Sequence, residues 1–191
     1  MNLPTFWTTN KHKLEESSKI LWIKLEWYTQ EDLEKIKLSW NWDLREIQSM
    51  NIIEIVEQKA RDIYDILWKP VIVEDTWLYL DWLNWFPWPF VKYLLEWPWL
   101  IALFKMMQSV ENRNAKAITW VSMFDWKNFT TWYWELKWTI PLEPRWDKFW
   151  WSNAFEPLWT NKTFWEMTED EKNKISMRKL ALENFIKNYK K

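Results

Sequence analysis

The sequence predicts an α/β fold, and three segments carry the prediction. Residues 3–8 have the character of a strand that leads through a polar turn into a helix. The β-branched run 71–73 follows an amphipathic helix over residues 52–67. Residues 115–124 and 128–140 are predicted to form two long strands. Strands that alternate with helices are typical of a sheet with helices packed against it.

The start of the first predicted helix has features of a phosphate-binding site. Thr8, Asn10, His12 and Lys13 follow the first strand directly. Free backbone N–H groups at a helix N-terminus attract anions, and a lysine adds positive charge. A capped surface helix has the same pattern, so this segment alone leaves both interpretations open.

The apolar run 71–73 is followed by two carboxylates, and the strand is predicted to end there. Glu74 and Asp75 come next, and Thr76 follows them. In open α/β sheets, ligands bind beyond the carboxyl ends of strands. Carboxylates at such a place favour a hard cation such as Mg²⁺ or a general base. The alternative is an ordinary strand with a solvated acidic turn.

Further elements are predicted between and beyond these segments. They are short strands at 20–27 and 35–39, helices at 90–96 and 100–107, a hairpin turn at 125–127, and a capped helix start at 168–172 with a last helix to about residue 189.

The composition limits the class of protein. The chain has 191 residues, which suits one domain, and its 26 basic and 27 acidic residues give a net charge of −1. This balance does not favour nucleic acid or an anionic membrane as a partner. There is no cysteine, and His12 is the only histidine, so Cys-based and His-ligated metal clusters are excluded. No signal-peptide pattern is present at the start, and a cytoplasmic protein is expected.

The tryptophan content is anomalous. The chain has 22 tryptophans and no glycine, whereas glycine averages about 7% of residues. Tryptophan occupies turn-like segments at 125–128, 144–147 and 158–161, where positive φ is common. Some bacterial lineages read the UGA codon as glycine, and we interpret most of these tryptophans as glycines in the native protein. A truly Trp-rich protein is the alternative, and mass spectrometry of the native protein distinguishes the two.

The stretch 77–104 is long and apolar enough to suggest a membrane span. Three prolines interrupt it, however, and three charged residues would lie inside the bilayer. No transmembrane helix is therefore expected.

Motifs over about residues 5–188 resemble the inosine/xanthosine triphosphate pyrophosphatase family. They are TTNKHKLEE at 8–16, VEDT at 73–76, NWFPWPFVK at 84–92, NRNA at 112–115, PRW at 144–146 and KTFWEMTEDEKNKISMR at 162–178. The resemblance implies a single domain over residues 1–191, with a long mixed twisted sheet, flanking helices and two lobes around a central nucleotide-binding cleft. It also implies a homodimer that, with Mg²⁺, hydrolyses non-standard purine nucleoside triphosphates (ITP, dITP and XTP) to the monophosphate and pyrophosphate.

The same resemblance assigns site residues. Asp75 is implied as the catalytic base, and Glu46 and Asp75 as metal ligands. The implied substrate-binding residues are Thr8, Asn10, Lys13, Lys59, Thr76, Lys92, Phe149, Trp151, Ser152, Lys172, Ser176, Met177 and Arg178. Without the resemblance, Lys59 is better explained as a snorkelling lysine at the edge of an apolar stripe, and Glu46 as a surface residue.

Two positions depart from the family pattern. Ser152 stands where the family has Asp, and Met177 where it has His, and both belong to the base pocket. An active enzyme with altered base preference is therefore expected. The competing interpretations are a nucleotide-binding homologue with little turnover and a Trp-rich protein that binds membrane interfaces.

Overall fold

The computed structural model describes most of the chain. The described residues are 4–8, 10–21, 28, 31–32, 34–36, 47–84, 86–87, 99–143, 145 and 154–189.

The fold is α/β, built on a five-stranded mixed sheet with the strand order β1-β2-β3-β4-β5. Strand β1 (Thr5–Phe6) runs parallel to β2 (Val71–Leu80). Strand β3 (Asn114–Phe124) lies between β2 and β4 (Phe129–Thr139), and β5 (Glu156–Pro157) is antiparallel to β4. The predicted pair of long strands is confirmed.

Helices precede and follow these strands. Among the described residues they are α1 (Lys11–Leu21), α3 (Ile52–Leu67), the 3-10 turn η1 (Asp81–Leu83), α5 (Trp99–Met107), α6 (Glu169–Ile175) and α7 (Met177–Tyr189). The α3 helix has the bounds that its apolar stripe predicts. Asn51 caps it, because its side chain accepts a hydrogen bond from the backbone N–H of Ile53 at 3.1 Å.

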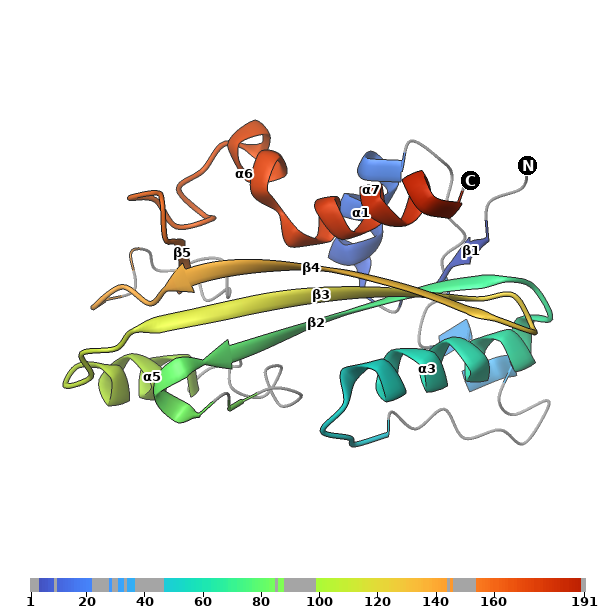
Figure 1. Ribbon diagram of the computed structural model, residues 1–191, viewed down its shortest axis with the longest axis horizontal. Helices are drawn as coiled ribbons and strands as arrows, with labels where there is room; N and C mark the ends of the chain where they lie inside the picture. The colour runs from blue at the N-terminus through green and yellow to red at the C-terminus, as the bar shows by residue number, and fades with distance from the viewer. Residues whose placement is uncertain are drawn as a thin grey trace. The chain divides into compact units, whose positions relative to one another are not determined.

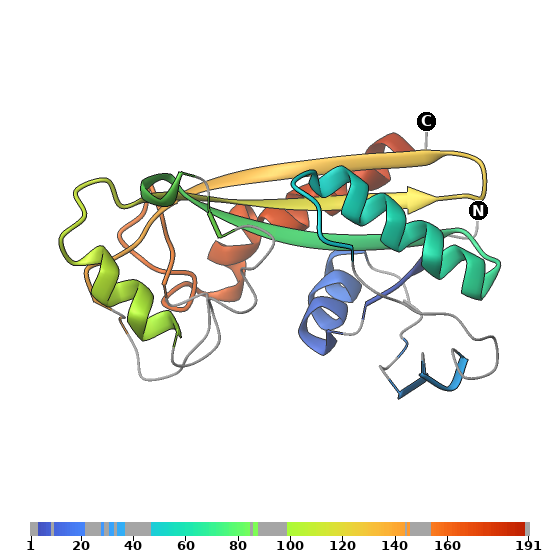
Figure 2. The same ribbon diagram turned by 90° about the horizontal axis from the view of Figure 1, so that it is seen from below.

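The chain divides into two compact units. The first comprises residues Met1–Asp75, Thr119–Trp134 and Arg178–Lys191. In this unit α1 and α7 cover one face of the strands, and α3 lies on the other (Figure 1; Figure 2). Its core under α1 and α7 consists of buried apolar side chains: Phe6, Leu21, Ile72, Val121, Met123, Ala181, Leu182 and Phe185.

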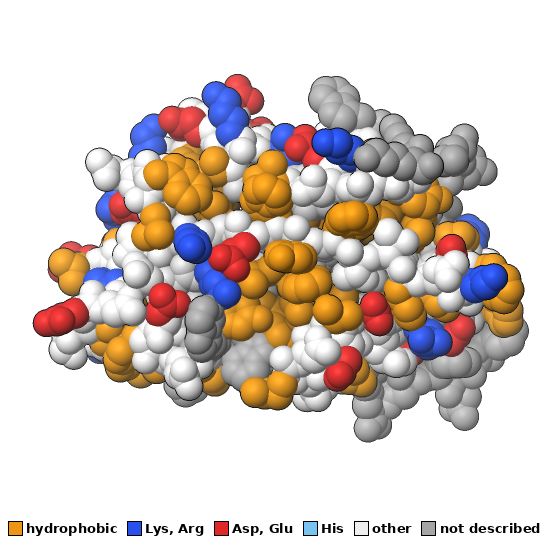
Figure 3. Space-filling view, viewed as in Figure 1, with side chains coloured by type: hydrophobic (Ala, Val, Ile, Leu, Met, Phe, Trp, Pro, Cys, Tyr) orange, Lys and Arg blue, Asp and Glu red, His pale blue; other side chains and the backbone are white. Residues whose placement is uncertain are grey.

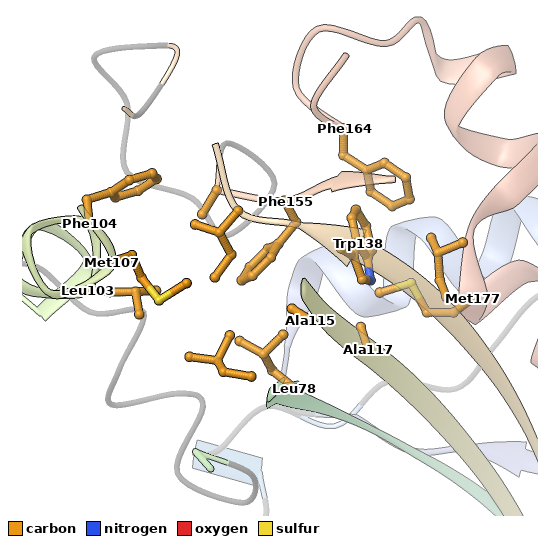
Figure 4. Close-up of a cluster of buried hydrophobic side chains, with 14 residues drawn as sticks. Leu78, Leu103, Phe104, Met107, Ala115, Ala117, Trp138, Phe155, Phe164 and Met177 are labelled. Atoms are coloured by element: carbon orange, nitrogen blue, oxygen red, sulfur yellow. The ribbon is translucent and has the colours of Figure 1, made fainter. Parts of the chain in front are cut away.

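The second unit comprises residues Thr76–Ile118 and Glu135–Met177. Its core joins one end of the strands to α5 and to the segments around β5 and α6. Figure 4 shows Trp138 in this core, with Phe155, Phe164 and Met177 beside it. The Trp138 and Phe164 rings meet edge to face, with centroids 4.5 Å apart. The expectation of one domain over residues 1–191 stays a prediction.

Three predicted elements differ from the structure. The strand that starts at Val71 does not end before the acids but continues to Leu80, so Glu74 and Asp75 lie in mid-strand. The β-forming residues after them, Thr76 to Tyr79, explain the extension. Lys35 and Ile36, predicted to begin a strand over 35–39, are helical, and Lys35 forms an i,i+4 ion pair with Glu31 at 2.9 Å. Likewise Ile20 and Leu21, predicted to begin a strand over 20–27, belong to α1.

Two tryptophans of the described residues occupy backbone positions that suit glycine. Positive φ angles occur among the described residues at Trp68 (51°), Asn84 (49°) and Trp126 (81°). Trp68 ends α3 in the left-handed conformation, and Trp126 lies in the turn between β3 and β4. Both are exposed, at 74% and 68%. A side chain with a Cβ is strained there, whereas glycine is not. The geometry therefore favours glycine at these two positions.

Within the part of the chain that the structure describes, no helix is long and apolar enough to cross a membrane.

Candidate functional site

The turn before α1 is organised by Asn10. Its side-chain oxygen accepts hydrogen bonds from the backbone N–H groups of His12 at 3.0 Å and Lys13 at 3.2 Å, and its own N–H donates to the Thr8 hydroxyl at 3.1 Å. Asn10 is thus the N-cap of the helix. Two backbone N–H groups that could have bound an anion therefore already donate hydrogen bonds to Asn10. An anion at this helix N-terminus would instead be attracted by the helix dipole and by the Lys13 ammonium.

The side chain of Lys13 joins α1 to strand β2. Its ammonium lies 3.0 Å from Glu74 Oε1 and 3.6 Å from Asp75 Oδ1. Thr76, the next residue, is half-buried in the same strand. The strand thereby presents two adjacent acids to one lysine.

Arg178, in the first turn of α7, completes this charged cluster. Its Nε donates to Glu74 Oε2 at 2.6 Å, and its Nη1 forms an ion pair with Glu16 of α1. The five side chains (Lys13, Glu16, Glu74, Asp75 and Arg178, here called the Glu74 cluster) all belong to the first unit. The cluster thus contains three carboxylates and two cations.

Burial makes Glu74 the centre of the cluster. Its side chain is only 1% exposed, against 11% for Arg178 and 21% each for Lys13 and Asp75. Burial alone raises the pKa of the Glu74 carboxyl. The positive charges of Arg178 and Lys13, with their hydrogen bonds, outweigh this effect and lower the pKa to about 2. Glu74 is therefore ionised at neutral pH.

The pKa of the Arg178 guanidinium shifts in the opposite direction. Burial by itself lowers its pKa, but the charges of Glu74 and Glu16 prevail and raise it above the usual value. A buried pair of this kind is destabilised strongly when one partner is removed, because the other charge stays buried without compensation.

Two predicted nucleotide-binding lysines lie near aromatic rings. The Lys59 ammonium, on α3, is 5.7 Å from the centroid of the Trp7 ring. Lys172, on α6, is 6.0 Å from the centroid of the Phe164 ring. These are cation–π distances.

The predicted base-recognition residues fall at the junction of α6 and α7. Ser176 ends α6, is 2% exposed, and donates its backbone N–H to the Lys172 carbonyl at 2.8 Å. The Met177 side chain points into the apolar core of the second unit, beside Trp138 (Figure 4). A thioether suits this apolar environment better than the imidazole expected from the family pattern.

Five predicted site residues lie outside the described residues: Glu46, Lys92, Phe149, Trp151 and Ser152. Among the described residues, no group of three His, Cys, Asp or Glu side chains is placed to hold a metal ion.

Sequence reasoning named Glu74 only as one of the two acids that follow the apolar run 71–73, and it gave Glu16 no role in the site. Two signals could have found them. Glu74 is two residues after Ile72, whose side chain packs under α1 and α7, and strand alternation puts both on one face. Glu16 is three residues after Lys13 in α1, so both lie on the same side of that helix.

Comparison with known proteins shows the class of protein to which this chain belongs. A model of the Ham1 family matches residues 5–188. The chain is 33% identical over 172 residues to a dITP/XTP pyrophosphatase of Hyperthermus butylicus, covering 90% of this chain and 86% of the relative. It is 33% identical over 180 residues to an inosine triphosphate pyrophosphatase of Kluyveromyces lactis, covering 91% and 88%.

The chain belongs to the Ham1 family. Its fold matches the structure of a HAM1 protein from Coxiella burnetii with a TM-score of 0.77, covering 95% of this chain and 94% of that one at 20% identity. The recognition made from the sequence motifs is confirmed.

Proposed function

We propose that this chain is a nucleoside triphosphate pyrophosphatase that hydrolyses ITP, dITP and XTP to the monophosphate and pyrophosphate. The observation that carries the proposal is Lys13 at the start of α1, held 3.0 Å from Glu74 and 3.6 Å from Asp75. A lysine beside a helix N-terminus binds phosphate, and an adjacent partly exposed carboxylate can accept a proton from water. The names of the two relatives point to the same reaction.

The residues of the Glu74 cluster would have different roles in the reaction. Lys13 would hold a phosphate and stabilise charge that develops on it. Asp75, 21% exposed, would orient and deprotonate the attacking water. Glu74 is buried, ionised and bound to two cations, so it would not act as the base. Lys59, Lys92 and Lys172 are proposed as further nucleotide contacts, with Thr8, Asn10 and Thr76 lining the phosphate end.

The negative charge of a triphosphate beside these carboxylates favours a divalent cation. A triphosphate and three carboxylates would repel each other without additional positive charge. Mg²⁺ prefers oxygen donors and is usually bound through one or two carboxylates together with substrate phosphates. Asp75 and Glu46 would hold it, and it would neutralise phosphate charge and lower the pKa of a bound water.

Base recognition is proposed for the residues after α6 and in the segment 149–152. Phe149 and Trp151 would stack on the purine. Ser176 and Arg178 would read its 6-oxo group, since an arginine donor pairs with an oxygen but not with an amino group. Met177 and Ser152 replace a histidine and an aspartate, so we propose a base preference weaker than that of the family.

The test is pyrophosphate release with Mg²⁺ from ITP, XTP, dITP, ATP and GTP, each at the same concentration. The proposal expects release from the first three at rates above those for ATP and GTP. Equal rates on all five would leave the reaction in place and refute the base preference. No release from any, together with measurable nucleotide binding, would establish the alternative, a nucleotide-binding homologue.

We also propose that the chain forms a homodimer. On the face drawn in Figure 3, hydrophobic side chains gather over the strands. Tyr133 and Trp134 of β4 are exposed at 54% and 39%, and β5 pairs only with Trp138 and Thr139 of that strand. Exposed apolar side chains on a sheet edge favour association. Light scattering after size exclusion would give twice the chain mass for a dimer and the chain mass for a monomer.

A further inference from the structure

We infer that Glu74 is a positioning residue for the phosphate site, because its single buried carboxylate fixes Lys13 and Arg178 together. The inference rests on the proposed function, in which Lys13 binds phosphate and Arg178 reads the base.

The geometry assigns one carboxylate oxygen to each cation. Glu74 Oε1 lies 3.0 Å from the Lys13 ammonium, and Oε2 lies 2.6 Å from Arg178 Nε. Lys13 belongs to the first turn of α1 and Arg178 to the first turn of α7. Glu74 is in mid-strand, where the backbone of β2 holds it. One rigid carboxylate therefore fixes the relative positions of cations from two different helices.

The position of Lys13 depends on the balance between two acids. Glu74 is the nearer one, and Asp75 is 0.6 Å farther from the ammonium (3.6 Å against 3.0 Å). If Glu74 lost its charge, Lys13 would be drawn towards Asp75, since Coulomb attraction grows as separation falls. The proposed base would then be neutralised by the lysine that should hold the phosphate. Arg178 would keep its ion pair with Glu16, and the acceptor at its Nε would lose its charge.

Two substitutions separate positioning by charge from packing. Glu74→Gln keeps the size of the side chain and removes its charge. Glu74→Asp keeps the charge and shortens the side chain by one methylene. The matched control is Glu135→Gln, which removes a carboxylate from another ion pair, with Lys116 at 3.2 Å in the second unit. For each protein, kcat and KM for ITP and the midpoint of thermal unfolding would be measured.

The inference predicts that charge matters more than shape. The kcat/KM of Glu74→Gln should fall by about a hundredfold, as for a misplaced binding group, and that of Glu74→Asp by about tenfold or less. Glu135→Gln should behave as the parent. A packing role predicts the reverse order, because Gln fills the same volume. That order, or parent-like kcat/KM in Glu74→Gln, would overturn the inference.

Folding and the proposed function are controlled separately. If Glu74→Gln is unfolded at the assay temperature, both variants are compared at a lower temperature at which circular dichroism shows them folded. A larger fall of kcat/KM in Glu74→Gln than in Glu74→Asp supports the inference there, and an equal or smaller fall refutes it. A parent that releases no pyrophosphate refutes the proposed function instead. Binding of inorganic tripolyphosphate, measured by calorimetry, then tests Glu74 directly: weaker binding by Glu74→Gln than by Glu74→Asp supports positioning, and equal binding overturns it.

Discussion

Glu74 and Arg178 lie 104 residues apart in the sequence, yet Arg178 Nε donates to Glu74 Oε2 at 2.6 Å. This contact ties the first turn of α7 to the middle of β2. Both side chains are almost completely buried, so their charges are shielded little by solvent.

Removing the cation from this pair should destabilise the protein. We expect Arg178→Met to lower the free energy of unfolding by about 3–5 kcal/mol, because the buried Glu74 carboxylate would lose the guanidinium that is bound to its Oε2. Urea unfolding followed by circular dichroism measures the change. The control is Lys35→Met, which removes an exposed i,i+4 pair with Glu31 and should cost about 0.5 kcal/mol or less. An equal loss of unfolding free energy in the two variants would contradict a buried ion pair between Arg178 and Glu74.

The low pKa of Glu74 predicts a specific pH dependence of stability. Because the folded-state pKa is about 2 and the unfolded value 4.5, the unfolded chain binds the proton more readily. Ionised Glu74 therefore stabilises the fold fully above about pH 5, and this stabilisation is lost as pH falls from there towards 2. The advantage of the parent over Glu74→Gln should shrink by about 3 kcal/mol over this range, at about 1.4 kcal/mol per pKa unit. Urea titrations at several pH values test it, and a difference that does not change with pH would refute it.

The proposed base should be separable from nucleotide binding. Asp75→Asn is expected to lower kcat by about a thousandfold, within the range attributed to general bases, because the amide cannot accept the proton from water. ITP binding, measured by calorimetry, should persist, since Lys13 keeps Glu74 as its nearer partner. The control Asp65→Asn changes an acid of α3 that forms no part of the Glu74 cluster. Retained turnover in Asp75→Asn would assign the base to another residue.

The glycine interpretation predicts that two substitutions are stabilising. Trp68→Gly and Trp126→Gly should each raise the free energy of unfolding by about 1 kcal/mol, because left-handed backbone is strained for a residue with a Cβ. Both side chains are mostly exposed, so little burial is lost. Trp165→Gly is the control, since Trp165 is also exposed at 44% but is not among the described residues with positive φ. It should be neutral or destabilising, and a gain equal to that at Trp68 would remove the conformational explanation.

Local patterns predicted much of the fold. The apolar stripe over residues 52–67 predicted the bounds of α3, and Thr168 with Glu171 forms the capping box that the segment 168–172 predicted at the start of α6. The end of β2 could not be predicted from local sequence patterns. Glu74 and Asp75 resemble residues that leave a sheet, and only the tertiary pairing with Lys13 and Arg178 makes a carboxylate tolerable in mid-strand.

The motifs predicted which residues belong to the site, but they did not predict how those residues are arranged. Lys13, Asp75 and Arg178 were all identified from the resemblance. No periodic pattern relates positions 104 residues apart, so the role of Glu74 as their common partner became visible only in the fold. The same holds for Met177, whose burial beside Trp138 follows from packing of the second unit and not from the motif around it.

The most direct test of the proposed reaction is the identity of its products. The protein would be incubated with ITP and Mg²⁺ and the mixture followed by phosphorus NMR. Hydrolysis between the α and β phosphates predicts inosine monophosphate and pyrophosphate in equal amounts from the first turnover. Inosine diphosphate with orthophosphate, or ITP that persists unchanged, would contradict the account.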